Sequence, residues 1–166
     1  MDLEKDFTEI YNTHAAKVHR LCLGYASGDN DLAKEWLQET FLKVWKQRKS
    51  FKGRSSVGTW IYRIAMNVCL SDLRQKRIHK PINESVLSIQ TDVVDENPAK
   101  ENDDKIEKMY NCISQLGEQN KVLILLELEN IPQETIARTV GIAHGAVRTR
   151  LSRIRKILLK CITNGK

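Results

Sequence analysis

Apolar residues recur at every third or fourth position along most of this 166-residue chain, which is the spacing of one face of an α-helix. In the first half of the chain the pattern predicts three helices: Phe7 to Tyr25, about Asp31 to Arg48, and about Val57 to Arg77. Asp29 or Asn30 can cap the second of these helices, and Ser55 or Ser56 can cap the third. We find no strand-like alternation of useful length, so the pattern favours an all-α fold.

The second half of the chain begins with a segment in which the helical pattern is lost. Residues 82–104 have no sustained periodicity, contain Pro98 and are polar, which predicts a linker. Apolar periodicity returns at Ile106 and continues beyond an interruption at Gly117. We therefore expect two small helical domains joined by a flexible acidic linker, with the boundaries 1–80, 81–105 and 106–166.

The C-terminal stretch IPQETIARTVGIAHGAVRTRLSRIRKIL has the spacing of a helix-turn-helix. The small Ala137 is followed four positions later by Gly141, where a tight turn needs positive φ, and then by Val147. An apolar stripe follows on the second helix, made of Val147, Leu151, Ile154 and Leu158. The opposite face is polar and basic, and carries Arg148, Thr149, Ser152, Arg153 and Lys156. Arginine can pair with guanine and lysine can neutralise phosphate, so this stretch favours DNA binding over an ordinary helical hairpin.

The charge of the chain is unevenly distributed. A net charge of +6 and a pI near 9.2 suggest a polyanionic partner. Residues 43–80 hold eleven Lys and Arg against one acid, Asp72, and the residues from Arg138 onward hold eight with no acid. Residues 84–107 reverse this balance, with eight acidic residues against two lysines. One basic run could be a solvated face, but two runs flanking an acidic segment indicate two modules that face nucleic acid.

The third predicted helix carries two neighbouring stripes. The first is apolar and reads as a core face: Val57, Ile61, Ile64, Ala65 and Val68. The second mixes an indole, an amide and cations: Trp60, Arg63, Asn67, Ser71 and Arg74. An aromatic ring can stack on an unpaired base while cations hold the backbone, so this row suits single-stranded nucleic acid. Taken alone, Trp60 is better explained as a core residue at the edge of the apolar stripe.

Other kinds of site find little support in the sequence. Cys22, Cys69, Cys112 and Cys161 are spread over the chain without a CxxC pair, which argues against a zinc site and against a disulfide framework. We expect them to be free thiols buried on helices, and we expect no cofactor and no metal. The chain shows neither a signal peptide nor an apolar run long enough to cross a membrane, so a cytoplasmic protein without membrane insertion is expected.

The segment DLAKEWLQETFLKVWKQRKSFKGRSSVGTWIYRIAMNVCLSDLRQKR resembles region 2 of bacterial sigma factors of the extracytoplasmic-function (ECF) group. The helix-turn-helix stretch resembles their region 4. Together the two resemblances cover about Phe7 to Arg77 and Met109 to Leu158. They imply two helical domains without catalytic activity or a small-molecule substrate, which guide core RNA polymerase to promoter DNA. An inhibitory anti-sigma factor is a further implied partner.

The resemblance also implies roles for individual residues. Those matching the polymerase-binding positions are Glu35, Gln38 and Glu39, and we add Asp31 and Leu42 as candidates because they share a helical face with Glu35 and Gln38. Those matching the positions that take the melted minus-ten strand are Phe51, Lys52, Ser55, Ser56, Trp60, Arg63 and Asn67. Those matching the minus-thirty-five readers are Arg148, Thr149, Ser152 and Arg153, and we add His144 and Lys156 of the same predicted helix as further candidates for this DNA contact. The linker matches a segment that threads into the polymerase.

Three alternatives remain to be weighed. A helix-turn-helix regulator acting without core polymerase explains the C-terminal stretch but not the aromatic and basic row of the third helix. An enzyme acting on nucleic acid needs paired carboxylates or a histidine site, whereas Asp29 and Asp31 sit at a helix start, where caps are expected. A helical interaction module with no role on DNA is the third.

Overall fold

A computed structural model describes the backbone of residues 6–79 and 98–164, with side chains up to residue 76 and again from residue 102. These residues contain α-helices, one short 3-10 helix and no strand, so the all-α prediction is confirmed for them. The elements are α1 (Phe7–Tyr25), α2 (Asn30–Gln47), η1 (Arg48–Ser50), α3 (Val57–His79), α4 (Pro98–Ser114), α5 (Glu118–Leu128), α6 (Gln133–Val140) and α7 (His144–Asn164). None of the described helices is long and apolar enough to cross a membrane.

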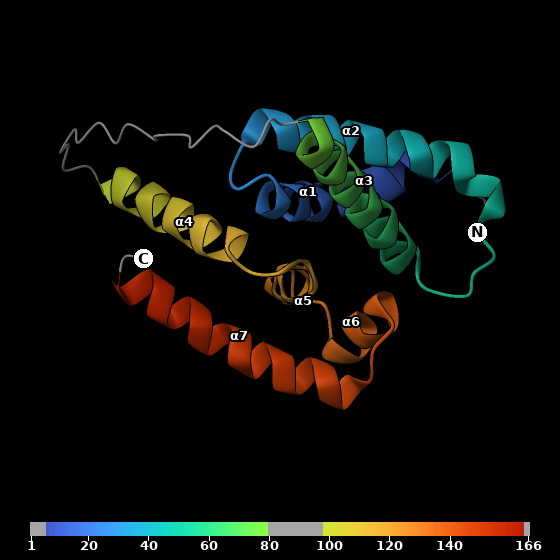
Figure 1. Cartoon of the computed structure of the whole chain (residues 1–166). Coiled ribbons are helices and arrows are strands. Elements are labelled where there is room, and N and C mark those ends of the chain that lie inside the picture. The colour runs from blue at the N-terminus through green and yellow to red at the C-terminus, as the bar shows by residue number, and fades with distance from the viewer. Residues whose placement is uncertain (1–5, 80–97, 165–166) are drawn as a thin grey trace.

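Helices α1, α2 and α3 pack against one another and form the first module (Figure 1). Its core contains Val18, Leu21 and Ile61, each at most 1% exposed. Trp36 is also buried, and its indole N–H donates to the Asp72 carboxylate at 2.9 Å, which satisfies the polar group of a core side chain.

Local signals in the sequence set the helix boundaries. Asp29 caps α2, because its carboxylate accepts a hydrogen bond from the Leu32 backbone N–H at 3.2 Å. Ser56 caps α3 in the same way, accepting from the Thr59 N–H at 3.2 Å. Gly141 ends α6 with φ of 81°, the left-handed conformation that the helix-turn-helix spacing predicts.

Helices α4 to α7 form the second module, with α5 at its centre (Figure 1). The run from Val122 to Leu126 is buried throughout, as expected for a helix surrounded by others. The predicted apolar stripe of α7 is confirmed, since Val147, Leu151, Ile154 and Leu158 are all buried against the rest of this module.

The predicted linker is too long at its C-terminal end. Helix α4 begins at Pro98, so residues 98–105, which we expected to lie in the linker, are helical. Proline suits a first helical position because its missing N–H would have no intrahelical partner. Residues 102–108 face solvent, so they form no buried apolar stripe that periodicity could detect. Residues 81–97 lie outside the described part of the chain.

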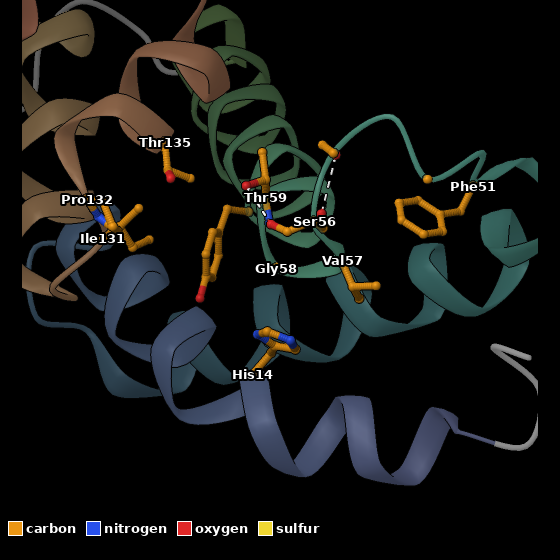
Figure 2. Close-up of a pocket in the computed structure, with 12 residues that line it drawn as sticks. His14, Phe51, Ser56, Val57, Gly58, Thr59, Ile131, Pro132 and Thr135 are labelled. Carbon is orange, nitrogen blue, oxygen red and sulfur yellow. Dashed lines mark hydrogen bonds between the residues drawn. The ribbon is translucent and has the colours of Figure 1, made fainter. Parts of the chain in front are cut away.

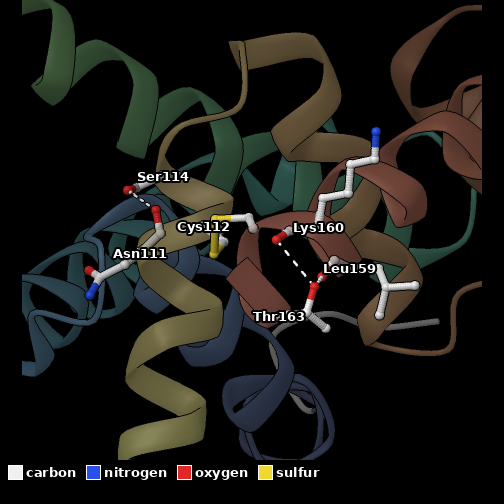
Figure 3. Close-up of a disulfide and its surroundings, with 7 residues drawn as sticks. Asn111, Cys112, Ser114, Leu159, Lys160 and Thr163 are labelled. Carbon is white, nitrogen blue, oxygen red and sulfur yellow. Dashed lines mark hydrogen bonds between the residues drawn. A yellow bond between two sulfur atoms is a disulfide. The ribbon is translucent and has the colours of Figure 1, made fainter. Parts of the chain in front are cut away.

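The expectation of four free thiols is wrong for one pair. Cys112 of α4 and Cys161 of α7 form a disulfide, with Cα atoms 5.9 Å apart (Figure 3). The two cysteines are separated by 49 residues, and it is the packing of α4 along α7 that brings them together. Cys22 and Cys69 are free and buried as expected, with their sulfur atoms 3.7 Å apart between α1 and α3.

The two modules are in contact. Helix α1 touches α4 and α5, and α3 touches α6 (Figure 1). The loop between η1 and α3 therefore lies near the helix-turn-helix, although the two segments are far apart in sequence.

Candidate nucleic-acid interface

The loop before α3 and the first turns of that helix bring two aromatic rings together. The ring centroids of Phe51 and Trp60 are 5.0 Å apart, with 39° between the ring planes, and both side chains are half-buried. A cavity of about 340 Å³ lies beside them, lined by Ser50, Phe51, Lys52, Arg54, Ser55, Trp60 and Arg63. Trp60 is thus neither a core residue nor fully exposed, and the aromatic pair borders a hollow with three cationic residues in its wall.

Two serines predicted for this site differ in their surroundings. The Ser56 hydroxyl is engaged in capping α3 and also meets the Thr59 hydroxyl at 2.9 Å. Ser55 faces the cavity, and its hydroxyl donates to the Ser56 carbonyl oxygen at 3.3 Å. Ser56 therefore stabilises the start of α3, while Ser55 lines the cavity.

The remaining row of α3 is exposed, as the spacing predicted. Asn67, Ser71 and Arg74 lie on the solvent side of the helix. Arg74 approaches Glu118 of α5 at 3.6 Å. Arg63 also contacts the second module. Its Nη2 donates to the Arg138 carbonyl oxygen at 2.6 Å, and its Nε donates to the Thr139 carbonyl oxygen at 3.2 Å.

A second cavity, of about 660 Å³, lies between the modules (Figure 2). Phe51 and Ser56 line it from the loop, while Pro132 and Thr135 line it from the start of α6. His14 of α1 forms part of its wall, and burial lowers the pKa of this imidazole, with the charge of Lys17 acting in the same direction.

The outer face of α7 carries the predicted recognition residues, all of them exposed: His144, Arg148, Thr149, Ser152, Arg153 and Lys156. The Thr149 hydroxyl donates to the Gly145 carbonyl oxygen at 3.0 Å, one turn back along the helix. Two other arginines of α7 turn inward toward α5. Arg150 donates to the Gln119 side chain at 3.2 Å, and Arg155 pairs with Glu127.

Helix α2 presents the predicted acidic ridge, and its members are all exposed: Asp31, Glu35, Gln38, Glu39 and Leu42. Leu42 is 57% exposed and adds an apolar side chain to this polar ridge. Glu39 pairs with Lys43 at 3.3 Å.

The sequence analysis missed an aromatic extension of this ridge. Trp45 lies one turn beyond Leu42 and is 39% exposed, and Phe7 packs against it with ring centroids 5.1 Å apart. The Arg48 guanidinium stacks 3.8 Å from the Trp45 ring centroid. The i, i+3 spacing of Leu42 and Trp45 could have shown that both lie on one face.

Models of two protein families match this chain, one in each module. Sigma-70 region 2 matches residues 10–78, and Sigma-70, region 4 matches residues 106–158. The chain belongs to the sigma-70 family of RNA polymerase sigma factors. Its relatives place it in the ECF group, because it is 31% identical to the ECF RNA polymerase sigma-E factor of Haemophilus influenzae over 93% of this chain and 86% of that protein.

Another relative matches this chain over a similar share of its length. The RNA polymerase sigma factor YlaC of Bacillus subtilis is 29% identical, over 96% of this chain and 89% of its own. Two solved structures share the fold. The sigma factor RpoE, crystallised with the anti-sigma factor NepR from Bartonella quintana, has a TM-score of 0.70 at 21% identity, covering 96% of this chain and 98% of its own. CnrH, solved in complex with the cytosolic domain of CnrY, has a TM-score of 0.72 at 15% identity, covering 98% and 91%.

Proposed function

We propose that this sigma factor binds core RNA polymerase, directs it to specific promoters and helps to open them, using one surface for each task. The observation that carries the proposal is the presence of both Sigma-70 regions in one chain, each with an exposed face of the chemistry that its task needs. The three surfaces are the ridge of α2, the loop and row of α3, and the outer face of α7.

The α2 ridge is proposed to bind the polymerase. Glu35 and Gln38 supply a carboxylate and an amide on one exposed face, with Leu42 beyond them. The exposed Trp45 offers an apolar anchor next to this polar group, and buried aromatics dominate the energetics of many interfaces. A basic or amphipathic helical surface on the polymerase would complement this combination.

The loop and row of α3 are proposed to hold the opened minus-ten strand. A base that has left the duplex can stack on Phe51 or Trp60, and the amide of Asn67 can read a base edge. Lys52 and Arg63 can neutralise the adjacent phosphates. Because stacking faces are unavailable in an intact duplex, this surface favours the open form of the promoter and so helps to melt it.

The outer face of α7 is proposed to bind the minus-thirty-five element as a duplex. Arg148 and Arg153 can contact guanine edges in the major groove, and Lys156 can contact phosphate. His144 stands at the start of the helix, where an exposed polar residue can meet the DNA backbone.

The remaining roles follow from this task. A protein that works on polymerase and promoter DNA acts in the cytoplasm, and a transcription initiation factor needs no catalytic site of its own. An anti-sigma factor is a proposed partner, in keeping with the similar sigma factor RpoE, which was crystallised with one.

Promoter-dependent transcription with purified core polymerase tests the proposal. Core enzyme supplied with this chain should make run-off transcripts from the promoters that the factor serves, whereas core enzyme alone should not. The leading alternative, a helix-turn-helix regulator that acts without core polymerase, predicts promoter binding by the free chain and no transcript from this minimal mixture.

A further inference from the structure

The disulfide joins α4 to the helix that carries the proposed minus-thirty-five readers (Figure 3). Cys112 lies near the C-terminal end of α4, and Cys161 lies in the last turn of α7. The last buried residue of α7 is Leu158, one turn before Cys161. Beyond Leu158 every described residue of α7 is exposed or half-buried, so the disulfide is the covalent anchor of this end of the helix.

The bond encloses the whole helix-turn-helix. Between Cys112 and Cys161 lie α5, α6 and most of α7, in a loop whose ends are 49 residues apart in sequence. Closing such a loop removes conformations from the unfolded chain and leaves the folded chain in place. Small helical modules with a single core depend strongly on staples of this kind. The redox state of this one pair should therefore shift the fraction of second modules that are folded.

A second pair of cysteines behaves differently. The sulfur atoms of Cys22 and Cys69 are 3.7 Å apart, yet both side chains are 0% exposed and both remain thiols. The hydrogen bond with Cys22 and burial raise the pKa of the Cys69 thiol, and a thiol that ionises poorly reacts slowly. Cys112 is 4% exposed, but Cys161 is half-buried near the end of a surface helix. Soluble thiols and disulfides can therefore reach Cys161, whereas the inner pair is shielded.

The cytoplasm, where the proposed function places this chain, keeps most protein thiols reduced through glutathione and thioredoxin. Disulfides of cytosolic proteins are usually transient, and they serve catalysis or redox sensing. A bond between Cys112 and Cys161 in that compartment therefore indicates a pair that changes state, and this step rests on the proposed function.

We propose that Cys112 and Cys161 form a redox-responsive modification site, through which the cellular thiol–disulfide balance controls binding to the minus-thirty-five element. In the disulfide form the loop that contains the helix-turn-helix is closed, and the outer face of α7 is held in place. In the dithiol form the second module is folded for a smaller part of the time, and the affinity for the element falls in proportion. The factor is thus most active under oxidising conditions.

Exchange begins at Cys161, because it is the more accessible of the two. A glutathione thiolate attacks the Cys161 sulfur, the bond to Cys112 breaks, and Cys112 leaves as a thiolate that takes up a proton. A second glutathione thiolate attacks the glutathione sulfur of this mixed disulfide and releases Cys161, which is protonated in turn. The protein gains two electrons and two protons, and two glutathione molecules leave as one glutathione disulfide.

The surface around Cys161 favours an anionic thiol such as glutathione. Helix α7 carries no acidic residue, and Lys156 and Lys160 are exposed on the turns that precede Cys161. Their positive charges attract the glutathione carboxylates and thiolate toward this end of the helix.

Duplex binding across a series of glutathione buffers tests the site. The probe is a fluorescent duplex with the minus-thirty-five element of a promoter that the holoenzyme transcribes. Alkylation of the denatured chain with a maleimide polymer reports the bonded fraction by gel shift. We expect the pair to pass from disulfide to dithiol as the buffer becomes as reducing as the cytosol. The Kd for the duplex should rise roughly threefold in parallel, as for a dithiol module that is folded about one third of the time. Returning the chain to glutathione disulfide should restore the lower Kd.

Two variants separate this pair from other effects of the buffers. Cys161→Ser should bind the duplex with the weaker Kd of the dithiol form in every buffer. Cys22→Ala is the matched control, because it removes a thiol of the inner pair and leaves the disulfide intact, and it should keep the full response. An equal Kd for the bonded and the reduced wild-type chain would overturn the proposal, and so would a pair that never changes state across the buffers.

A scrambled duplex, measured in parallel, distinguishes a failure of this proposal from a failure of the proposed function. If the oxidised chain binds the element and the scrambled duplex equally well, the minus-thirty-five function falls. The alkylation pattern and the helix content by circular dichroism then decide whether the pair still controls folding of the second module. Unchanged helix content on full reduction would show that it does not.

Discussion

Arg155 of α7 donates a hydrogen bond from Nε to the Glu127 carboxylate of α5, with an Nε–Oε2 distance of 3.2 Å. Together with Arg150, it ties the recognition helix to the centre of the second module. Arg148 and Arg153 on the same helix face solvent instead. The four arginines of this stretch therefore form two pairs: Arg150 and Arg155 contact α5, whereas Arg148 and Arg153 are exposed and are the pair proposed to bind DNA.

This division predicts different effects of alanine substitutions in α7. Arg148→Ala and Arg153→Ala should each cost roughly 1–3 kcal/mol of discrimination between the minus-thirty-five element and scrambled DNA, if each pairs with a base. Lys156→Ala should weaken binding to both sequences alike. It should also make the dependence of the logarithm of the binding constant on the logarithm of salt concentration shallower, by about the amount that one phosphate contact contributes. Fluorescence anisotropy over a range of salt concentrations measures both quantities. Arg155→Ala serves as the control, with lower thermal stability and unchanged discrimination.

Equal losses on specific and scrambled DNA for Arg148→Ala and Arg153→Ala would mean that these residues contact phosphate rather than bases.

The α2 ridge should be needed for binding to the polymerase but not for folding. Glu35→Lys combined with Gln38→Ala should abolish binding to core enzyme, because it reverses a charge and removes an amide on the proposed contact face. Both side chains are exposed, so the circular dichroism spectrum and the thermal midpoint should be unchanged. Glu107→Lys, at an exposed acid of α4, applies the same charge reversal elsewhere as a control. Full core binding by the folded double variant would place the polymerase surface on another face.

The disulfide should contribute measurably to stability. Closing a loop between residues 49 apart lowers the entropy of the unfolded chain, worth about 4 kcal/mol in the loop-entropy model. Reductant, or Cys112→Ser, should therefore lower the urea midpoint, and reductant should have little further effect on that variant. Thiol titration of the denatured chain gives an independent check. It should find two free thiols before reduction, at Cys22 and Cys69, and four after it. If the urea midpoint of the wild-type chain is the same with and without reductant, the disulfide does not contribute to stability.

His14 should make stability depend on pH. Its pKa in the folded chain lies below the ordinary 6.5, because the imidazole is desolvated and lies near Lys17. The unfolded chain therefore binds the proton more readily, and the stabilisation present above pH 6.5 is lost as the pH falls toward the folded-state pKa. Urea unfolding at pH 7.5 and 5.5 measures the free energy of unfolding. This free energy should fall less between the two pH values for His14→Gln than for the wild-type chain. Identical declines would mean that His14 is not the group responsible.

The sequence predicted those parts of the fold that depend on neighbours along a helix. Burial of Val147 and Leu151 follows from the 3.6-residue period, and the left-handed turn at Gly141 follows from the need for positive φ. The caps at Asp29 and Ser56 are equally local. The exposure of Asn67 follows from the same period, because Asn67 lies on the stripe beside the buried one that contains Ala65 and Val68.

Features that depend on contacts between distant segments were beyond the sequence. The Cys112–Cys161 bond requires α4 to lie along α7, which no local spacing encodes. The contact of Arg63 with α6 arises from the packing of the two modules, so periodicity could identify its face but not its partner. The helical residues before Ile106 were missed because residues 102–108 are exposed and form no buried apolar stripe.

Permanganate reactivity of thymines in the minus-ten region tests the central claim most directly, because only unpaired thymines react. Core polymerase with the wild-type chain should make these thymines reactive on a duplex promoter, and core polymerase alone should not. Asn67→Ala should reduce the reactivity while core binding stays normal, and a promoter already melted by mismatches should restore only part of the loss. Asn111→Ala, at an exposed amide of α4, should behave as the wild-type chain does. Undiminished reactivity with Asn67→Ala on the duplex promoter would contradict a role for this face of α3 in holding the opened strand.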